Sequence, residues 1–220
     1  EARLSESFKK IAKAAEAKPA AFGEDINLGN YESSAEEQPY QDDPSKLPSD
    51  TKEQMLGAGV ILDDVKQRSG TYIQVDNAPV HSSIREEGVE VLPVSQALEK
   101  YDWLTDYWWR AVPVDTDKYT ANIELNQHDG YSIRSLPRYK SVLPVQACLY
   151  LSKAGLAQNV HNIVIAEEDS ELNIITGPSA RSRPAIRRVR VRDLRKRGPR
   201  HHRFLDREDE TGPGRVPSGL

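Results

Sequence analysis

The sequence contains one cysteine, Cys148, among 220 residues. A single cysteine cannot form an internal disulfide, and it excludes zinc sites that are built on several cysteines. No apolar run approaches the roughly 18 residues that a membrane-spanning helix needs. The first residues also lack the basic, apolar and small-residue order of a signal peptide. Together these absences predict a cytoplasmic protein with no membrane segment.

Charge is abundant but unevenly distributed. Residues 181–220 contain 13 Lys and Arg against 5 Asp and Glu, a net charge of +8, whereas residues 1–180 carry a net charge of −12. Hydrophobic residues make up 37% of the chain and charged residues 29%. These values indicate a normal core with polar tails. An Arg-rich arm is typical of proteins that bind RNA or other polyanions.

The N-terminal part reads as helix and polar linker. Apolar residues recur every three to four positions in residues 1–21, which predicts an amphipathic helix. Residues 22–50 are poor in apolar side chains and contain an acidic run at 36–43, so we expect an extended linker with a solvated acidic surface. A short helix is predicted at Thr51–Leu56.

Short strands and one aromatic segment follow. Thr71–Val75 and Val89–Leu92 have the composition of strands, and residues 93–101 predict a helix. Residues 101–109 hold five aromatics, which could stack on single-stranded nucleic acid. No basic residue lies among them, so we expect them to pack against the β-core.

Three apolar runs dominate the later part of the chain: Val145–Leu151, Ile163–Ile165 and Leu172–Ile175. They are separated by turn residues, and no helix-length segment lies between the last two. Strands that recur about every ten residues are typical of a sandwich or of a solenoid whose coils share a core.

Two places invite a chemical interpretation. His128 precedes Asp129, but neighbouring residues of a strand point to opposite faces, so Asp129 is not placed to orient His128 as a base. Asp129-Gly130 is first of all a turn signal. Cys148 reads as a small buried hydrophobe. It is also the candidate metal ligand, because a lone thiol can contribute to an iron–sulfur cluster that is shared between chains.

The segments Leu143-Pro-Val-Gln146 and His161-Asn-Ile-Val-Ile-Ala-Glu-Glu-Asp-Ser-Glu-Leu-Asn-Ile-Ile-Thr-Gly177 resemble the core of the SufB/SufD proteins of iron–sulfur cluster assembly. The resemblance extends from about Leu56 to Gly177. In the family a cysteine associated with cluster handling follows the last of these strands. Here Thr176-Gly177 is followed by Pro178-Ser179, which fits a SufD-like or unspecialised member better than a cluster scaffold.

The resemblance implies a mainly β fold with an N-terminal α part, in which a partial right-handed parallel β-helix follows a helical and linker region. We therefore expect four regions: a helix and linker at 1–55, an α+β part at 56–125, the start of the β-helix at 126–179 and a basic tail at 180–220. The last coil would expose Leu172–Ile175 as an unpaired edge and make the chain marginally stable.

The tail at 180–220 has three interpretations. One is an Arg-rich arm that binds RNA or other anionic partners, and another is a disordered tail. The third is a segment translated out of frame, because codons can be chosen for 191–197 and 201–211 that encode strand-like segments one base later. Under the third interpretation the chain is truncated or frameshifted after about residue 177.

The function implied by the resemblance is a non-catalytic subunit of cluster assembly. Its expected partners are a SufC-type ABC ATPase and another SufB/SufD-type subunit, in a homo- or heterodimer. No intrinsic cofactor and no catalytic residue are expected, although the full complex would carry a transient iron–sulfur cluster. The alternative is an RNA-binding protein that uses the Arg-rich tail. A weaker option is a β-helical carbohydrate-active enzyme, which would need clustered carboxylates on one face.

Overall fold

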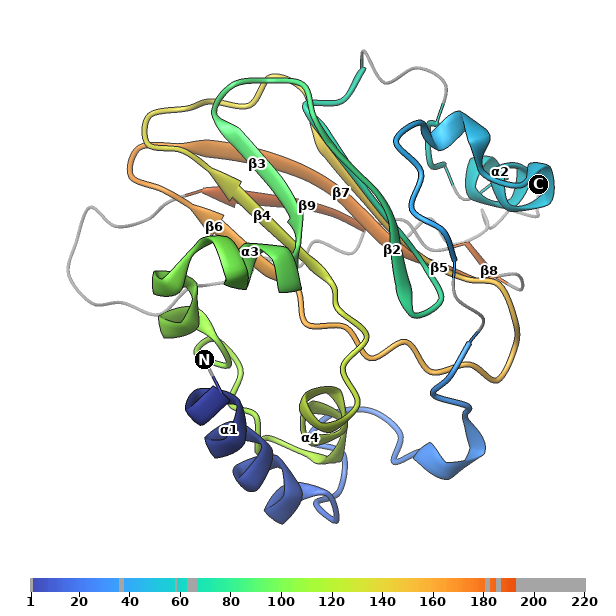
Figure 1. The fold of residues 1–220 in the computed structure, drawn as a ribbon, viewed down its shortest axis with the longest axis vertical. Helices are drawn as coiled ribbons and strands as arrows, with labels where there is room; N and C mark the ends of the chain where they lie inside the picture. The colour runs from blue at the N-terminus through green and yellow to red at the C-terminus, as the bar shows by residue number, and fades with distance from the viewer. Residues whose placement is uncertain are drawn as a thin grey trace, which may run out of the picture.

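Two β-sheets packed face to face form the centre of the molecule, with helices on their outer faces and at one end (Figure 1). The structure, a computed structural model, describes residues 2–35, 38–57, 59–62, 67–180, 183–184 and 187–192.

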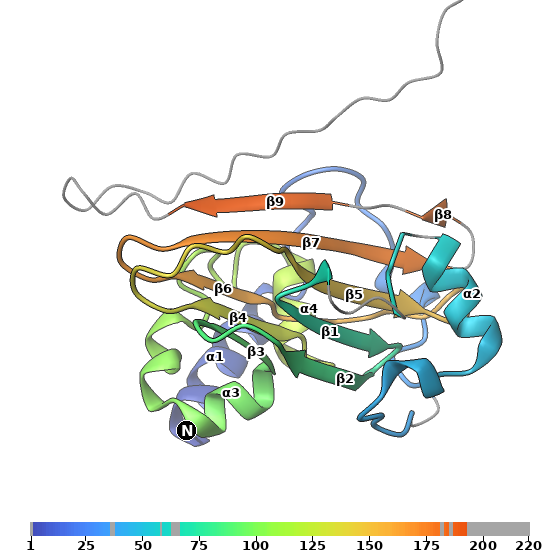
Figure 2. The same ribbon diagram turned by 90° about the horizontal axis from the view of Figure 1, so that it is seen from above.

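The larger sheet has the strand order β2-β1-β5-β7-β8, and β9 also pairs with β7. Strands β1, β5 and β7 are parallel to one another, whereas β2, β8 and β9 are antiparallel to their neighbours. Figure 2 shows β9 lying along β7 at the edge of this sheet. The strands are β1 (Gly70–Val75), β2 (Ala78–Ile84), β5 (Val145–Leu151), β7 (Glu171–Ala180), β8 (Arg183–Pro184) and β9 (Arg187–Arg192).

The smaller sheet consists of β3 (Val89–Pro93), β4 (Tyr131–Ser135) and β6 (Ile163–Ala166). Strand β4 is central, antiparallel to β3 and parallel to β6. In both sheets, strands from residues 56–125 pair with strands from residues 126–179. These two stretches of the chain therefore build one β-core together.

The main core lies between the two sheets. Successive side chains of a strand point to opposite faces, so alternate residues of each strand enter this layer. Tyr72 of β1, Ile133 of β4 and Leu172 of β7 are fully buried there. The rings of Tyr72 and Tyr131 meet edge to face with their centroids 5.7 Å apart, a geometry that aromatic pairs favour.

The outer faces of both sheets are also covered. Met55 of α2 (Ser49–Gly57) packs on β1, β2 and β5 of the larger sheet. Helix α3 (Val94–Lys100) and the 3₁₀ helix η4 (Asp102–Tyr107) cover the smaller sheet at Ile163 and Ile165. Four of the five aromatics at 101–109 take part in this second layer, as the sequence predicted, and Trp109 packs with α1 and α4 instead.

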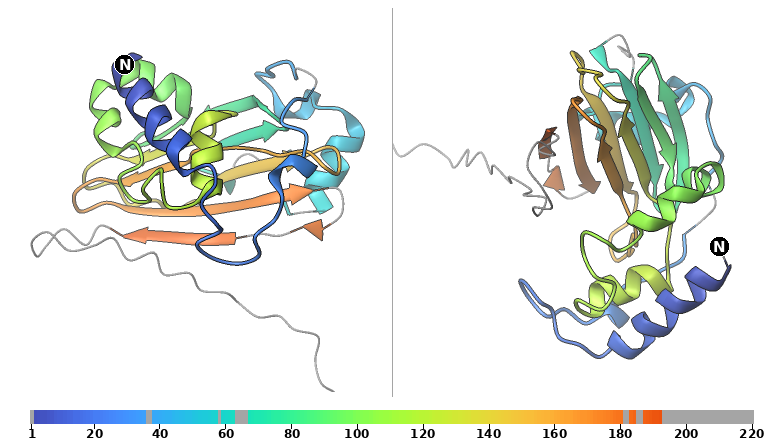
Figure 3. Two further views of the ribbon diagram at one scale, coloured as in Figure 1. Left: turned by 90° about the horizontal axis from the view of Figure 1, so that it is seen from below. Right: turned by 90° about the vertical axis from the view of Figure 1, so that its left-hand side faces the viewer.

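A helical pair lies at one end of the sheets (Figure 3). Helix α1 (Ala2–Ala15) packs against α4 (Lys118–Leu125), and the small residues Ala12, Ala15 and Ala121 are completely buried where they meet. Asp117 caps α4 by accepting hydrogen bonds from two backbone N–H groups of its first turn.

The predicted linker at residues 22–50 packs along the surface of the β-core through hydrogen bonds to β2. It contains the short 3₁₀ turns η1 (Leu28–Asn30) and η2 (Pro44–Lys46). Gln41 N–H donates to the Val80 carbonyl at 2.7 Å. The Tyr40 hydroxyl accepts from Ser82 N–H at 3.0 Å and donates to the Ser82 carbonyl at 3.1 Å. These bonds cover the outer edge of β2, which would otherwise present unpaired backbone groups.

The expectation of a partial right-handed parallel β-helix is wrong for the described residues. Strands of such a solenoid pair in parallel with the strands of neighbouring coils. Here β1–β2, β3–β4 and β7–β9 are antiparallel, so the protein has mixed α/β sheets instead. The expected exposed edge at Leu172–Ile175 is wrong as well, because β7 pairs on both sides and Leu172 and Ile174 are buried.

Part of the predicted tail is structured. Strand β9 lies within residues 180–220, where the sequence indicated no strand. The interpretations of the tail as a disordered or out-of-frame segment otherwise concern residues 193–220, which lie outside the described residues.

Candidate functional site

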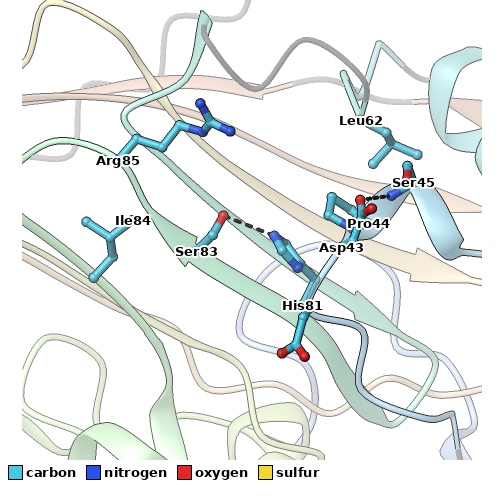
Figure 4. A pocket seen from close by; sticks show the side chains of 9 residues that line it. Asp43, Pro44, Ser45, Leu62, His81, Ser83, Ile84 and Arg85 are labelled. Carbon is cyan, nitrogen blue, oxygen red and sulfur yellow. Dashed lines mark hydrogen bonds between the residues drawn. The ribbon is translucent and has the colours of Figure 1, made fainter.

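An open pocket of about 600 Å³ lies beside strand β2, between that strand and the segment that covers its edge (Figure 4). Its volume falls within the range of small-molecule sites. Its polar lining comes from Asp42, Asp43, Ser45, His81, Ser83 and Arg85.

Strand β2 and the residue after it supply three polar side chains of the pocket. His81 and Ser83 of β2 are two positions apart, so they project from the same face of the strand, and Arg85, the residue directly after β2, also lines the pocket. Figure 4 shows Ser83 and Arg85 on one side of the His81 ring, and Asp43 and Ser45 on the other. Pro44, Leu62 and Ile84 supply an apolar part of the lining.

His81 is held rigidly in the wall of the pocket. It is 2% exposed, its Nδ1 lies 2.9 Å from the Gln41 carbonyl oxygen, and its Nε2 lies 3.0 Å from Ser83 Oγ. A carbonyl oxygen only accepts, so Nδ1 carries a proton and donates it. Nε2 is the ring nitrogen that shares a hydrogen bond with the Ser83 hydroxyl. His81 therefore positions Ser83.

The pocket carries opposite charges on its two sides. Asp43 Oδ1 accepts from Ser45 N–H at 2.9 Å, and this bond holds the pKa of the Asp43 carboxyl below its usual range. The exposed Asp42 extends the acidic side. Arg85 is the cation on the other side. In the described part of the chain, neither Asp42 nor Arg85 forms an ion pair.

The arrangement is suited to binding a charged molecule through hydrogen bonds. Within the described ranges, no group of three or more His, Cys, Asp or Glu side chains is placed to hold a metal ion. The sequence suggested only a solvated acidic surface at 36–43, because the approach of Asp43 to β2 depends on contacts nearly 40 residues apart in the chain.

Cys148, the predicted metal ligand, is 1% exposed and lies in the apolar cluster between β1, β5 and α2. Burial raises the pKa of its thiol to about 12. Metals bind the thiolate, so this environment opposes iron ligation. Ligation by Cys148 stays a prediction, and it requires the thiol to leave this cluster.

His128 and Asp129 have separate partners. His128 Nδ1 accepts from Asn159 N–H at 3.1 Å, and burial lowers the pKa of its imidazole. Asp129 accepts from the N–H and the hydroxyl of Ser95 at 3.1 and 2.6 Å. Asp129 thus ties its turn to the start of α3, as expected for a structural turn residue.

A second polar cluster was not visible in the sequence. The ring of His161 packs at a tilt against Trp108 and Trp109, with centroid distances of 3.9 and 4.2 Å. Both indole N–H groups donate to the buried carboxylate of Glu124, at 3.1 and 2.6 Å. The cluster joins the smaller sheet to α4. No local pattern links His161 to tryptophans more than 50 residues away.

None of the described helices has the length and apolar content needed to span a bilayer. The Arg-rich segment proposed for RNA binding lies largely outside the described residues.

The fold and the pocket together define a mixed α/β protein with a charged surface site. No family model matches the chain. Curated relatives do match it. An iron–sulfur cluster assembly SufBD family protein of Methanothermobacter thermautotrophicus is 42% identical over 179 residues, which cover 79% of this chain and 43% of the relative.

A SufBD family protein of Archaeoglobus fulgidus is 51% identical over 126 residues, or 57% of this chain and 34% of the relative. One of Pyrococcus horikoshii is 24% identical over 139 residues, 61% of this chain and 31% of the relative. The chain thus spans less than half the length of the curated relatives it matches. Its resemblance to the SufB/SufD family is confirmed.

Proposed function

We propose that this chain takes part in iron–sulfur cluster assembly. The observation that carries the proposal is its 42% identity over 179 residues to a relative named as a cluster assembly protein. An identity of 51% to a second such relative supports it independently. The identity covers most of this chain, so it concerns the β-core and not one short motif.

In this proposal the chain is a non-catalytic subunit. It joins a second SufB/SufD-type subunit, in a homo- or heterodimer, and a SufC-type ABC ATPase. Strand β6 offers one feature in support, because β4 is its single strand partner among the described residues. An edge strand with free backbone groups is a template for pairing with another chain.

The iron–sulfur cluster is the cargo of this machinery. We assign no cluster ligand to the described residues in their present conformation, since the one cysteine is buried with its thiol protonated. In this account the ligands of the iron–sulfur cluster come from the assembled complex. Cys148 contributes only if assembly exposes its thiol from the apolar side chains that now bury it.

Co-purification tests the proposal. The tagged chain is co-expressed with a SufC-type ATPase and a SufB/SufD-type subunit, and the complex is analysed by size-exclusion chromatography with light scattering. We expect both proteins to co-elute with the chain in fixed stoichiometry. An unrelated ABC ATPase serves as the control. Free elution of all three components would contradict the proposal.

A truncated variant separates this function from RNA binding. Deleting residues 193–220 leaves every described strand in place. The subunit complex should survive this deletion. If the deletion abolishes the complex, or if the intact chain binds RNA with a steep salt dependence that the deletion removes, the tail-based function is favoured instead.

A further inference from the structure

The pocket beside β2 contains charged side chains that have no ion-pair partner among the described residues. Arg85 is exposed, and its guanidinium forms no ion pair within the described part of the chain. The exposed carboxylate of Asp43 accepts from the Ser45 N–H through Oδ1 and forms no ion pair within the described part of the chain. Asp42 is exposed beside it. A ligand that satisfied both sides would carry a cationic and an anionic group.

The spacing along β2 limits the length of such a ligand. The acidic side adjoins His81, whose ring is bound to the carbonyl of Gln41 just before Asp42 and Asp43. Arg85 follows His81 by four positions, about 13 Å along an extended strand. The side chains of Arg85 and of the two aspartates can extend towards each other from the two ends of the pocket. A ligand of two to three extended residues, roughly 7–10 Å long, is therefore the length that we expect to bridge them. A free amino acid is too short.

The remaining lining suits a peptide backbone. The hydroxyl oxygens of Ser45 and Ser83 can still accept hydrogen bonds from peptide N–H groups, although the Ser83 hydroxyl is also bonded to His81 Nε2. Leu62 and Pro44 offer apolar contact for a side chain. The guanidinium of Arg85 has the planar fork that binds a carboxylate through two parallel hydrogen bonds.

We propose that this pocket binds a short zwitterionic peptide of two to three residues, with its terminal ammonium at Asp42 and Asp43 and its terminal carboxylate at Arg85. The middle of the peptide lies along Ser83 and over the apolar lining. This assignment concerns the pocket alone and is independent of the role in cluster assembly.

Titration of the ¹⁵N-labelled chain with the tripeptide alanyl-leucyl-alanine tests the assignment. Because the pocket is open and offers few contacts, we expect a Kd on the order of 1 mM. The backbone amide signals of Ser45, Ser83 and Arg85 should shift together and saturate. The same peptide with both termini blocked, by N-acetylation and C-amidation, should bind at least tenfold more weakly.

Charge variants locate the two ends. Arg85→Gln should weaken binding about tenfold, and it should remove the preference for a free carboxylate over an amide. Asp42→Asn should reduce the preference for a free ammonium. The matched controls Arg110→Gln and Asp106→Asn alter exposed charges that do not line the pocket, and they should leave the Kd unchanged.

Two results would overturn the assignment. One is equal affinity for the free and the doubly blocked tripeptide, which would show that the terminal charges are not recognised. The other is the absence of saturable shifts at these three amides up to about ten times the expected Kd. Both results are independent of whether the chain joins the ATPase, so failure here leaves the proposed function standing.

Discussion

At the scale of single residues, Cys148 is the clearest case of a side chain whose chemistry is set by its surroundings. It is buried among Ile73, Val80 and Tyr150, and burial raises the pKa of the thiol to about 12. Thiolate, not thiol, is the reactive species. The folded protein should therefore suppress both alkylation and metal binding at this position.

We predict that iodoacetamide at pH 8 labels Cys148 at least a hundredfold more slowly in the native chain than in the chain unfolded by urea, because the native thiol is protonated and inaccessible. Mass spectrometry of quenched samples measures both rates. Rapid labelling of the native chain would show that the apolar side chains around Cys148 readily expose the thiol, and it would favour Cys148 as an iron ligand.

His161 should make stability depend on pH. Burial against Trp108 and Trp109 lowers the pKa of its imidazole to about 4 from an ordinary value near 6.5. The unfolded chain therefore binds more protons than the native chain between these values, so stability falls as the pH drops from 6.5 to 4. The contribution is at most about 3 kcal/mol.

Urea unfolding of the wild type and of His161→Phe at pH 7 and pH 4.5 measures this effect. Phe keeps the aromatic contact but does not titrate, so the loss of stability on acidification should be smaller in the variant. His128, whose pKa is also lowered by burial, titrates in both proteins and cancels in the comparison. Equal losses in the two proteins would refute the assignment.

At the scale of elements, the turn before β4 depends on glycine. Gly130 has φ +132°, and an added Cβ would lie 2.5 Å from the His161 carbonyl oxygen. Gly130→Ala should lower the free energy of unfolding by about 2 kcal/mol, through backbone strain and this clash. The control Gly57→Ala, where a Cβ meets nothing within 4 Å, should leave stability unchanged or raise it by up to about 1 kcal/mol.

The edge of β2 depends on Tyr40. Tyr40→Phe removes two hydrogen bonds to Ser82. It should lower the free energy of unfolding by about 1 kcal/mol and speed hydrogen exchange of the Ser82 amide. Tyr31→Phe is the control, since the Tyr31 hydroxyl has no hydrogen-bond partner among the described residues. Unchanged exchange at Ser82 would show that Tyr40 does not protect this edge.

Local sequence signals predicted individual elements well. The run Val145–Leu151 is strand β5, residue for residue, and Thr71–Val75 and Val89–Leu92 lie within β1 and β3. Pairing was harder to predict. The two-residue turn Asp76–Asn77 between β1 and β2 is a local signal for an antiparallel hairpin, which a solenoid of parallel coils does not contain. Nothing near β1 indicates that β5, 70 residues later, joins its other side in parallel.

The candidate pocket was hidden from the sequence for the same reason. Asp43 and Arg85 come together only because the segment at 40–41 bonds to the edge of β2. His128 and Asp129 have different partners, but strand alternation is not the reason. Both residues lie in the turn before β4, where Asp129 has φ +69°, as the Asp-Gly turn signal predicted.

At the scale of the whole molecule, the same double-sheet core carries the sequence relationship to cluster assembly proteins and the ligand pocket. The match to the relative from Methanothermobacter thermautotrophicus covers 79% of this chain. The pocket beside β2 and the outer edge of β6 lie on different sheets of this core. Ligand binding and subunit association can therefore be tested separately.

The central claim is that the chain promotes cluster assembly. The most direct measurement follows [2Fe–2S] formation on an apo-ferredoxin, by visible absorbance, in a mixture of iron, sulfide donor, ATP, SufC-type ATPase and SufB/SufD-type subunit. Our account predicts that adding this chain raises the ATP-dependent rate at least severalfold and that heat-denatured chain does not. The same rate with and without native chain would contradict the account.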